Sequence, residues 1–90
     1  MDLYNNKKDG DEFKAIMKRY GGGSVLWIKS RRMARFSKNR KIFLIVPGDD
    51  YITFTIHQPC NNGIIYVSPI IYSLSDFDNL LFLAMRNHYI

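Results

Sequence analysis

Apolar side chains near the start of the chain recur at helical spacing. Positions i, i+3, i+4 and i+7 are filled by Phe13, Ile16, Met17 and Tyr20, which places these residues on one face of an α-helix. Asp9 can cap this helix, with Glu12 three residues later, as in a capping box. The three glycines at 21–23 can end it, because glycine accepts the left-handed backbone found just after a helix. The pattern predicts a helix over about residues 10–20.

Four short runs rich in β-branched and aromatic residues follow, and each is typical of a strand. They span residues 24–29, 41–46, 51–57 and 63–68. In the third run, Ile52, Phe54 and Ile56 alternate with polar residues, which indicates a strand with one buried face and one wet face. A Pro-Gly-Asp-Asp turn at 47–50 and an Asn-Gly pair at 62–63 separate the last three runs. These turns predict an antiparallel meander.

The last apolar segment predicts a helix from Ser73 or Ser75, either of which can cap it, to about residue 87. Asp76 and Asp78 then lie near its positive end, where acidic side chains are favourable. Its apolar residues surround most of the helix, and such a helix needs burial on more than one side. One interpretation is a homodimer interface of Phe77, Leu80, Phe82, Leu83 and Met85. The other is that these residues cover the loop at 69–72.

Together these elements predict an α+β fold: a four-stranded, mostly antiparallel sheet with one helix at each end of the chain. Both helices are expected on one face of the sheet, because each apolar stripe must be buried against another layer. A chain of 90 residues is the size of one domain. Within it, we expect residues 1–8 to be frayed and residues 30–40 to form a protruding basic segment.

Composition supports a folded protein and excludes several classes. The chain is 47% hydrophobic and 14% aromatic, which is too much for a disordered tail. A single cysteine, Cys60, allows no internal disulfide and suits a reducing compartment. The polar N-terminus has no signal-peptide core, and no apolar run approaches the ~20 residues that span a bilayer. We therefore expect a cytoplasmic protein with no membrane association.

Charge is divided sharply along the chain. Residues 1–41 carry twelve bases and four acids, a net of +8, whereas residues 42–90 carry one base and four acids, a net of −3. Seven bases and no acid lie between Lys29 and Lys41. A one-sided positive field suits a polyanion or an acidic protein surface.

The basic segment has two plausible shapes from sequence alone. As a helix, it would place Arg31, Arg35 and Lys38 on one face; as a hairpin, residues 37–40 would be the turn. Either shape would gather its cations on one protrusion, where they could contact phosphates without reading bases. Trp27, Phe36 and Tyr51 could stack on unpaired bases. The predicted binding residues are Trp27, Lys29, Arg31, Arg32, Arg35, Phe36, Lys38, Arg40 and Lys41.

Catalytic, metal and cofactor sites are not predicted. His57 and Cys60 lie three apart across a turn, where a nucleophile and its base rarely meet. One cysteine with His57 and His88 is a poor zinc ligand set. The acids are explained by turns and helix starts. The triple glycine leaves a helix, whereas the glycines of a phosphate loop precede one.

Three functional hypotheses remain from the sequence. The first is a non-enzymatic protein that binds a nucleic-acid backbone, or a nucleoprotein, through residues 29–41. The second is a small inhibitor or adaptor, of the kind that phages and mobile elements use, which docks on a host protein machine for defence or transcription. The third is a toxin-like ribonuclease that uses Arg35, His57 or His88. The aromatic signature of four-stranded RNA-binding modules is absent from the sequence.

Overall fold

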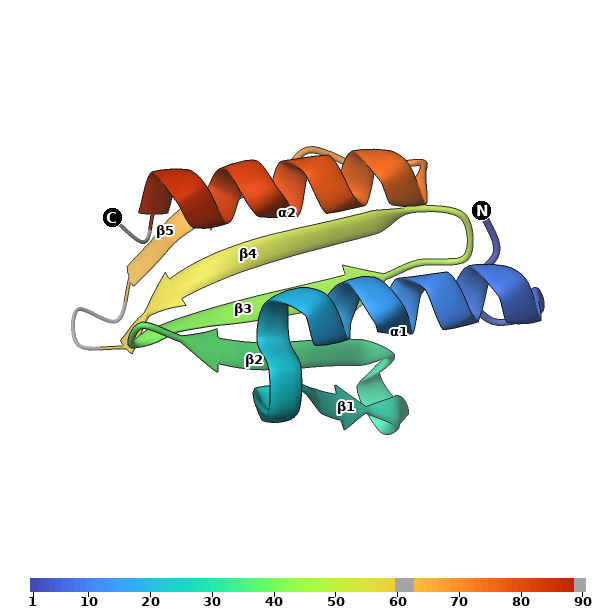
Figure 1. The fold of residues 1–90 in the computed structure, drawn as a ribbon, viewed down its shortest axis with the longest axis horizontal. Helices are drawn as coiled ribbons and strands as arrows, with labels where there is room; N and C mark the ends of the chain where they lie inside the picture. The colour runs from blue at the N-terminus through green and yellow to red at the C-terminus, as the bar shows by residue number, and fades with distance from the viewer. Residues whose placement is uncertain (60–62, 89–90) are drawn as a thin grey trace.

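The computed structural model describes residues 1–59 and 63–88, the last without its side chain (Figure 1). Two α-helices enclose five strands in the sequence. The elements are α1 (Lys7–Gly21), β1 (Leu26–Ile28), β2 (Met33–Lys38), β3 (Lys41–Pro47), β4 (Ile52–Gln58), β5 (Gly63–Val67) and α2 (Leu74–His88). Short 3-10 turns, η1 (Gly22–Ser24) and η2 (Lys29–Arg31), flank β1. The predicted α+β fold is confirmed.

The sheet is a fully antiparallel meander in the order β1-β2-β3-β4-β5. It has five strands where four were predicted, because β2 forms inside the basic segment. Ala34 and Phe36 of β2 are buried while Arg35 and Ser37 are exposed, which is the alternation expected of a strand. The charged residues concealed this alternation in the sequence. Of the two shapes considered for the basic segment, the hairpin is confirmed and the helix is wrong.

The hairpin between β2 and β3 turns tightly at Asn39 and Arg40. Lys38 pairs with Lys41, so two residues form the loop. Both have positive φ, 50° at Asn39 and 64° at Arg40. Positive φ at both loop residues characterises the type I′ turn, whose twist matches that of the flanking strands. The tip of the basic segment is therefore a compact two-residue loop.

The core lies between one face of the sheet and both helices (Figure 1). The predicted inward residues of β4, Ile52, Phe54 and Ile56, are at most 1% exposed. Phe43 and Ile45 of β3 lie beside them in register and are also buried. Ala34 and Phe36 of β2 and Ile71 also belong to the core. The helices contribute Phe13, Ile16 and Met17 of α1 and Leu74, Phe77, Leu81, Ala84 and Met85 of α2.

The N-terminal segment differs from its prediction. Helix α1 begins at Lys7, three residues earlier than expected, and its cap is Asn6, whose side chain accepts a hydrogen bond from the Asp9 backbone N–H at 3.2 Å. The Asp9 carboxylate instead accepts one from the Asp2 N–H at 3.0 Å. Residues 1–8 were expected to be frayed; in the structure, Met1 and Leu3 pack against the core. Helix α1 ends as predicted, with Gly22 at a φ of 56°.

Helix α2 has a buried side and an exposed side. Ser73 caps it, accepting from the Asp76 N–H at 3.1 Å. Phe77 and Met85 are buried against the rest of the core, so their predicted place in a dimer interface is wrong. Phe82 and Leu83 are 53% and 45% exposed, which leaves them on the outer side.

Asp78 of α2 links the two helices. Its carboxylate accepts hydrogen bonds from the Tyr20 hydroxyl and, at 2.6 Å, from the Arg19 guanidinium. The sequence explained Asp78 by helix-start electrostatics, and the tertiary contact adds a second role. Within residues 1–59 and 63–88, no helix is long and apolar enough to cross a membrane.

Candidate nucleic-acid interface

The seven cations of residues 29–41 do not share one protrusion. Lys29 and Arg31 lie in η2, and Arg32 follows directly. Lys38, Arg40 and Lys41 lie at the opposite end of β2, whose six residues span roughly 20 Å. Arg35 lies between these groups, beside Leu26 and Leu44 in the register of the sheet. Its neighbours Ala34 and Phe36 point into the core, so Arg35 points away from the helices. The prediction of one basic surface is therefore wrong.

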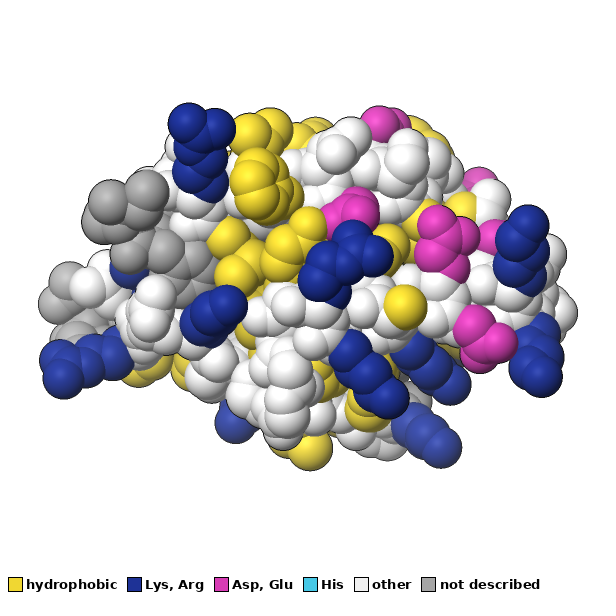
Figure 2. Space-filling model, in the orientation of Figure 1, with side chains coloured by type: hydrophobic (Ala, Val, Ile, Leu, Met, Phe, Trp, Pro, Cys, Tyr) yellow, Lys and Arg dark blue, Asp and Glu magenta, His cyan; other side chains and the backbone are white. Residues whose placement is uncertain are grey.

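A different basic surface forms where α1 approaches the β1 edge of the sheet. A groove of about 870 Å³ lies between the N-terminal segment, α1, β1, η2 and the start of β2. Five cations and one acid line it: Lys7, Lys14, Lys18, Lys29, Arg32 and Asp11. We call this the basic groove. Figure 2 shows Lys and Arg side chains along the α1 side of the molecule and below it.

Three of the groove cations come from α1, and the sequence analysis missed them as a group. Lys7, Lys14 and Lys18 stand at i, i+7 and i+11, which is close to two and three full helical turns. They therefore form one stripe beside the buried stripe of Phe13 and Met17. This spacing was visible in the sequence. Its importance was not, because only tertiary packing places the stripe opposite Lys29 and Arg32.

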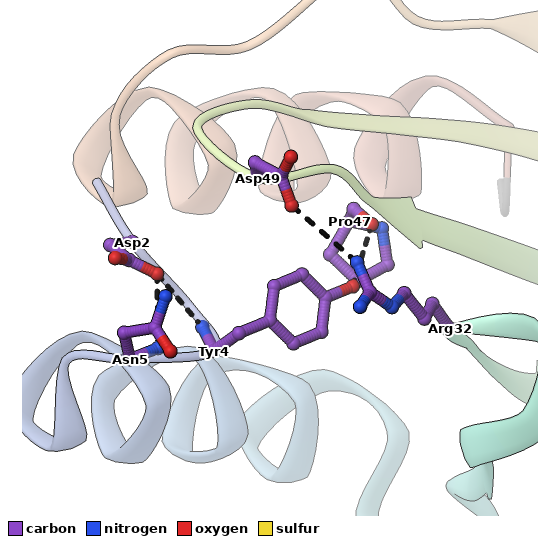
Figure 3. Close-up of polar contacts among 6 residues, drawn as sticks. All are labelled: Asp2, Tyr4, Asn5, Arg32, Pro47 and Asp49. Atoms are coloured by element: carbon purple, nitrogen blue, oxygen red, sulfur yellow. Dashed lines mark hydrogen bonds and ion pairs between the residues drawn. The ribbon is translucent and has the colours of Figure 1, made fainter.

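Arg32 is held by a set of contacts around Tyr4 (Figure 3). Its backbone is left-handed, with a φ of 48°, and its N–H donates to the Lys29 carbonyl at 3.1 Å. The guanidinium lies over the Tyr4 ring, 4.5 Å from the centroid, within the range of a cation–π contact. It also lies 3.5 Å from the Asp49 carboxylate. Both partners are well exposed, so this ion pair contributes little and Arg32 can exchange Asp49 for a phosphate.

Tyr4 is fixed at both ends. Its hydroxyl donates to the Pro47 carbonyl at 2.9 Å, and its backbone N–H donates to the Asp2 carboxylate at 3.2 Å. Partial burial raises the pKa of Tyr4 above its usual value, so the hydroxyl stays protonated and remains a donor at neutral pH. Hydrogen bonds from the backbone of Asn5 and Tyr4 lower the pKa of Asp2. Tyr4 thus contacts Arg32 through the face of its ring and carries no negative charge that would neutralise the guanidinium.

Trp27 places an aromatic ring in the basic groove. Its indole is 37% exposed and lies edge-on to Phe13, with ring centroids 5.9 Å apart. Phe36 is 1% exposed and stacks on Phe43 in the core, so its predicted role in binding is wrong. Tyr51 is exposed but follows the β3–β4 turn, outside the groove lining. Of the three aromatic candidates, Trp27 is the one that joins the cations.

The comparisons with known proteins give no family. The chain matches no protein-family model, no curated protein and no solved structure. Any function must therefore be argued from the described residues and their chemistry.

Of the side chains considered for catalysis, the structure describes those of Arg35 and His57. His57 lies in β4, with its Nε2 2.8 Å from the Thr55 hydroxyl. Cys60 and the His88 side chain lie outside the described residues. Among residues 1–59 and 63–87, no cluster of three or more His, Cys, Asp or Glu side chains can hold a metal ion. Among the described residues that line the basic groove, Asp11 is the one acid, so the lining carries a net positive charge that suits an anion.

Proposed function

We propose that this protein binds single-stranded nucleic acid in the basic groove and does so without catalysis. The observation that carries the proposal is the lining of the groove, which has five cations against one acid, beside a partly exposed tryptophan. Cations in such an arrangement attract phosphates, and the aromatic ring offers a surface for a base.

The phosphate contacts are assigned to the lysines and Arg32. Lys7, Lys14, Lys18 and Lys29 form no ion pair with any residue in the described part of the chain, so their charges are free for a ligand. Arg32 has a weak partner in Asp49. Five cations can neutralise about five phosphates, and each neutralised phosphate releases counterions from the strand. Binding should therefore be strongly salt-dependent and weakly dependent on base sequence.

Trp27 favours an unpaired strand over a duplex. A base inside a duplex is stacked on its neighbours and has no free face, whereas a base in a single strand can turn onto an aromatic side chain. The cations on both sides of Trp27 would hold the backbone while one base contacts the indole. This division of roles is sequence-tolerant, because every base has a π-face.

Fluorescence anisotropy with labelled oligonucleotides tests the proposal. A 15-nucleotide single strand and a duplex of the same length would be titrated with the protein at several salt concentrations. Five neutralised phosphates on a single strand predict a slope of log K against log salt of about −3.5. The single strand should bind more tightly than the duplex. Absence of binding at low salt would contradict the proposal.

One observation is compatible with the ribonuclease hypothesis. Arg35 and His57 line the same shallow hollow, of about 360 Å³, on the sheet face that lies away from the helices. General acid–base cleavage needs a group that accepts a proton and a second that donates one, and His57 is the one side chain in the lining suited to this. We therefore expect RNA to stay intact during binding, and gel analysis of the bound RNA checks this.

A further inference from the structure

The face of the sheet opposite α1 and α2 is not covered by any described helix or strand. We call it the open face. One row of side chains crosses all five strands in register: Leu26, Arg35, Leu44, Thr55 and Val67. Leu26 and Val67 are 50% and 66% exposed, and Val46 and Ile64 elsewhere on the face are 36% and 58% exposed. Four exposed apolar side chains on one sheet face make that face a candidate interaction surface.

Arg35 is the one fixed cation among the described residues of the open face. It lies between Leu26 and Leu44 and forms no ion pair with any residue in the described part of the chain. The shallow hollow beside it is lined by Ile42, Leu44 and His57, among others. None of the residues that the register places on this face is acidic. Arg35 is therefore a positive charge between two leucines, without a counter-ion among the described residues.

We propose that the open face docks an amphipathic helix of a partner protein, with an Asp or Glu beside its apolar stripe. Covering the apolar residues also covers Arg35, and an unpaired buried charge is costly. The occupant must therefore supply a carboxylate. A helix is the expected form, because helices cover the other face of this sheet and helix-on-sheet layers are a standard way to bury one.

Two other occupants fit less well. A second copy that used the same face would bring another Arg35 and no acid, so the two positive charges would be buried together. Among the open-face residues named above, a nucleic acid would find one cation, Arg35, and one aromatic ring, the imidazole of His57. The basic groove offers it five cations. The open face and the basic groove lie on opposite sides of the sheet, so the two proposals are independent.

Two synthetic 18-residue helical peptides test this proposal. They share one leucine stripe, and one carries Glu beside it where the other carries Lys. Methyl NMR of the full chain would follow Leu26, Leu44 and Val67 of the open face, with Leu74 and Leu81 of the core as internal controls. The Glu peptide should shift the open-face methyl groups and bind about tenfold more tightly than the Lys peptide, as expected for one buried charge pair.

Variants at Arg35 separate partner recognition from solubility. Arg35→Gln should abolish the preference for the Glu peptide, and Arg35→Glu should reverse it. If Arg35→Gln only increases self-association and leaves the peptide preference unchanged, Arg35 serves solubility and the proposal is wrong. Absence of open-face shifts with the Glu peptide at millimolar concentration would also overturn it. So would sedimentation of the wild type as a dimer that Leu44→Lys dissociates.

Discussion

At the residue scale, tryptophan fluorescence monitors the basic groove, because Trp27 lines the groove and is the one tryptophan in the chain. A base that stacks on the indole should quench its fluorescence. Trp27→Ala should weaken binding of a single strand about tenfold, since base–aromatic stacking contributes roughly 1–3 kcal/mol. Fluorescence titration of the wild type and anisotropy of the variant measure the two effects.

Tyr72→Ala is the matched control for Trp27. Tyr72 is 63% exposed and does not line the groove, so its loss should leave affinity unchanged. Equal weakening in both variants would mean that the effect is not specific to the groove. A different result would be that the protein binds a duplex as tightly as a single strand, with no effect of Trp27→Ala. That result would mean that the groove binds phosphates without stacking on a base.

Gly21 illustrates how packing constrains one residue. A Cβ added there would lie 2.6 Å from Val25 Cγ2 and 2.7 Å from Phe36 Cγ, and Phe36 is buried in the core. Gly21→Ala should therefore lower the free energy of unfolding by about 1–3 kcal/mol, as overpacking does. At Gly23 no atom lies within 4 Å of an added Cβ. Gly23→Ala should stay within about 0.5 kcal/mol of wild type in urea denaturation.

At the element scale, the β2–β3 hairpin carries backbone strain at its tip. Arg40 has a φ of 64°, a conformation that costs a non-glycine residue roughly 1–2 kcal/mol. Arg40→Gly makes the favoured Asn-Gly loop and should stabilise the protein by about 0.5–1 kcal/mol, measured by urea denaturation. Lys38→Gly, inside β2, should instead destabilise it by about 0.5–1 kcal/mol. A destabilised Arg40→Gly variant would mean that the arginine side chain contributes more than its backbone costs.

The contact between α1 and α2 predicts a loss of stability at alkaline pH. Partial burial, together with the hydrogen bond to Asp78, raises the pKa of Tyr20 above the ordinary tyrosine value of 10.0. The folded state therefore favours the protonated phenol, and this contribution is fully present below pH 10 and is lost as pH rises through the raised pKa. Urea denaturation at a series of pH values should show a smaller alkaline loss in Tyr20→Phe. An identical loss would contradict the assignment.

At the scale of the whole molecule, the meander converts a division of charge along the chain into a division in space. Neighbouring strands are consecutive in sequence, so the basic first half of the chain stays on the side of α1 and β1 (Figure 1). The resulting field should accelerate the approach of a polyanion to that side. The basic groove then provides the local contacts.

A pair of double variants separates the whole-molecule charge from the groove. Lys14→Glu with Lys18→Glu, and Lys38→Glu with Arg40→Glu, each lower the net charge from +5 by four. The bulk electrostatic effect is therefore matched. The first pair should weaken single-strand binding at least tenfold more than the second, because it also removes two groove contacts. Equal affinities in anisotropy titrations would show that the net charge, and not the groove, determines binding.

Features that depend on neighbouring residues could be predicted from the amino-acid sequence. The apolar spacing of Phe13 to Tyr20 and the capped apolar segment after Ser73 predicted both helices. The alternation in β4 and the turn residues at 47–50 predicted most of the meander. These signals are local, because helix and strand periods are properties of consecutive residues. Residues 33–38 were not predicted as a strand because Arg35 and Lys38 interrupt the segment, which leaves Ala34 and Phe36 as the two inward side chains that mark the strand.

Only the tertiary structure decided which cations share a surface. Arg35 left the predicted basic surface because alternate side chains of a strand point to opposite faces. Lys7, Lys14 and Lys18 joined Lys29 and Arg32 because α1 packs beside β1 and β2. This packing gathers into one groove cations that lie up to 25 residues apart in the sequence, from Lys7 to Arg32. The spacing of charged residues along the chain does not show which of them will lie together on the surface. Their grouping follows from how the apolar faces pack.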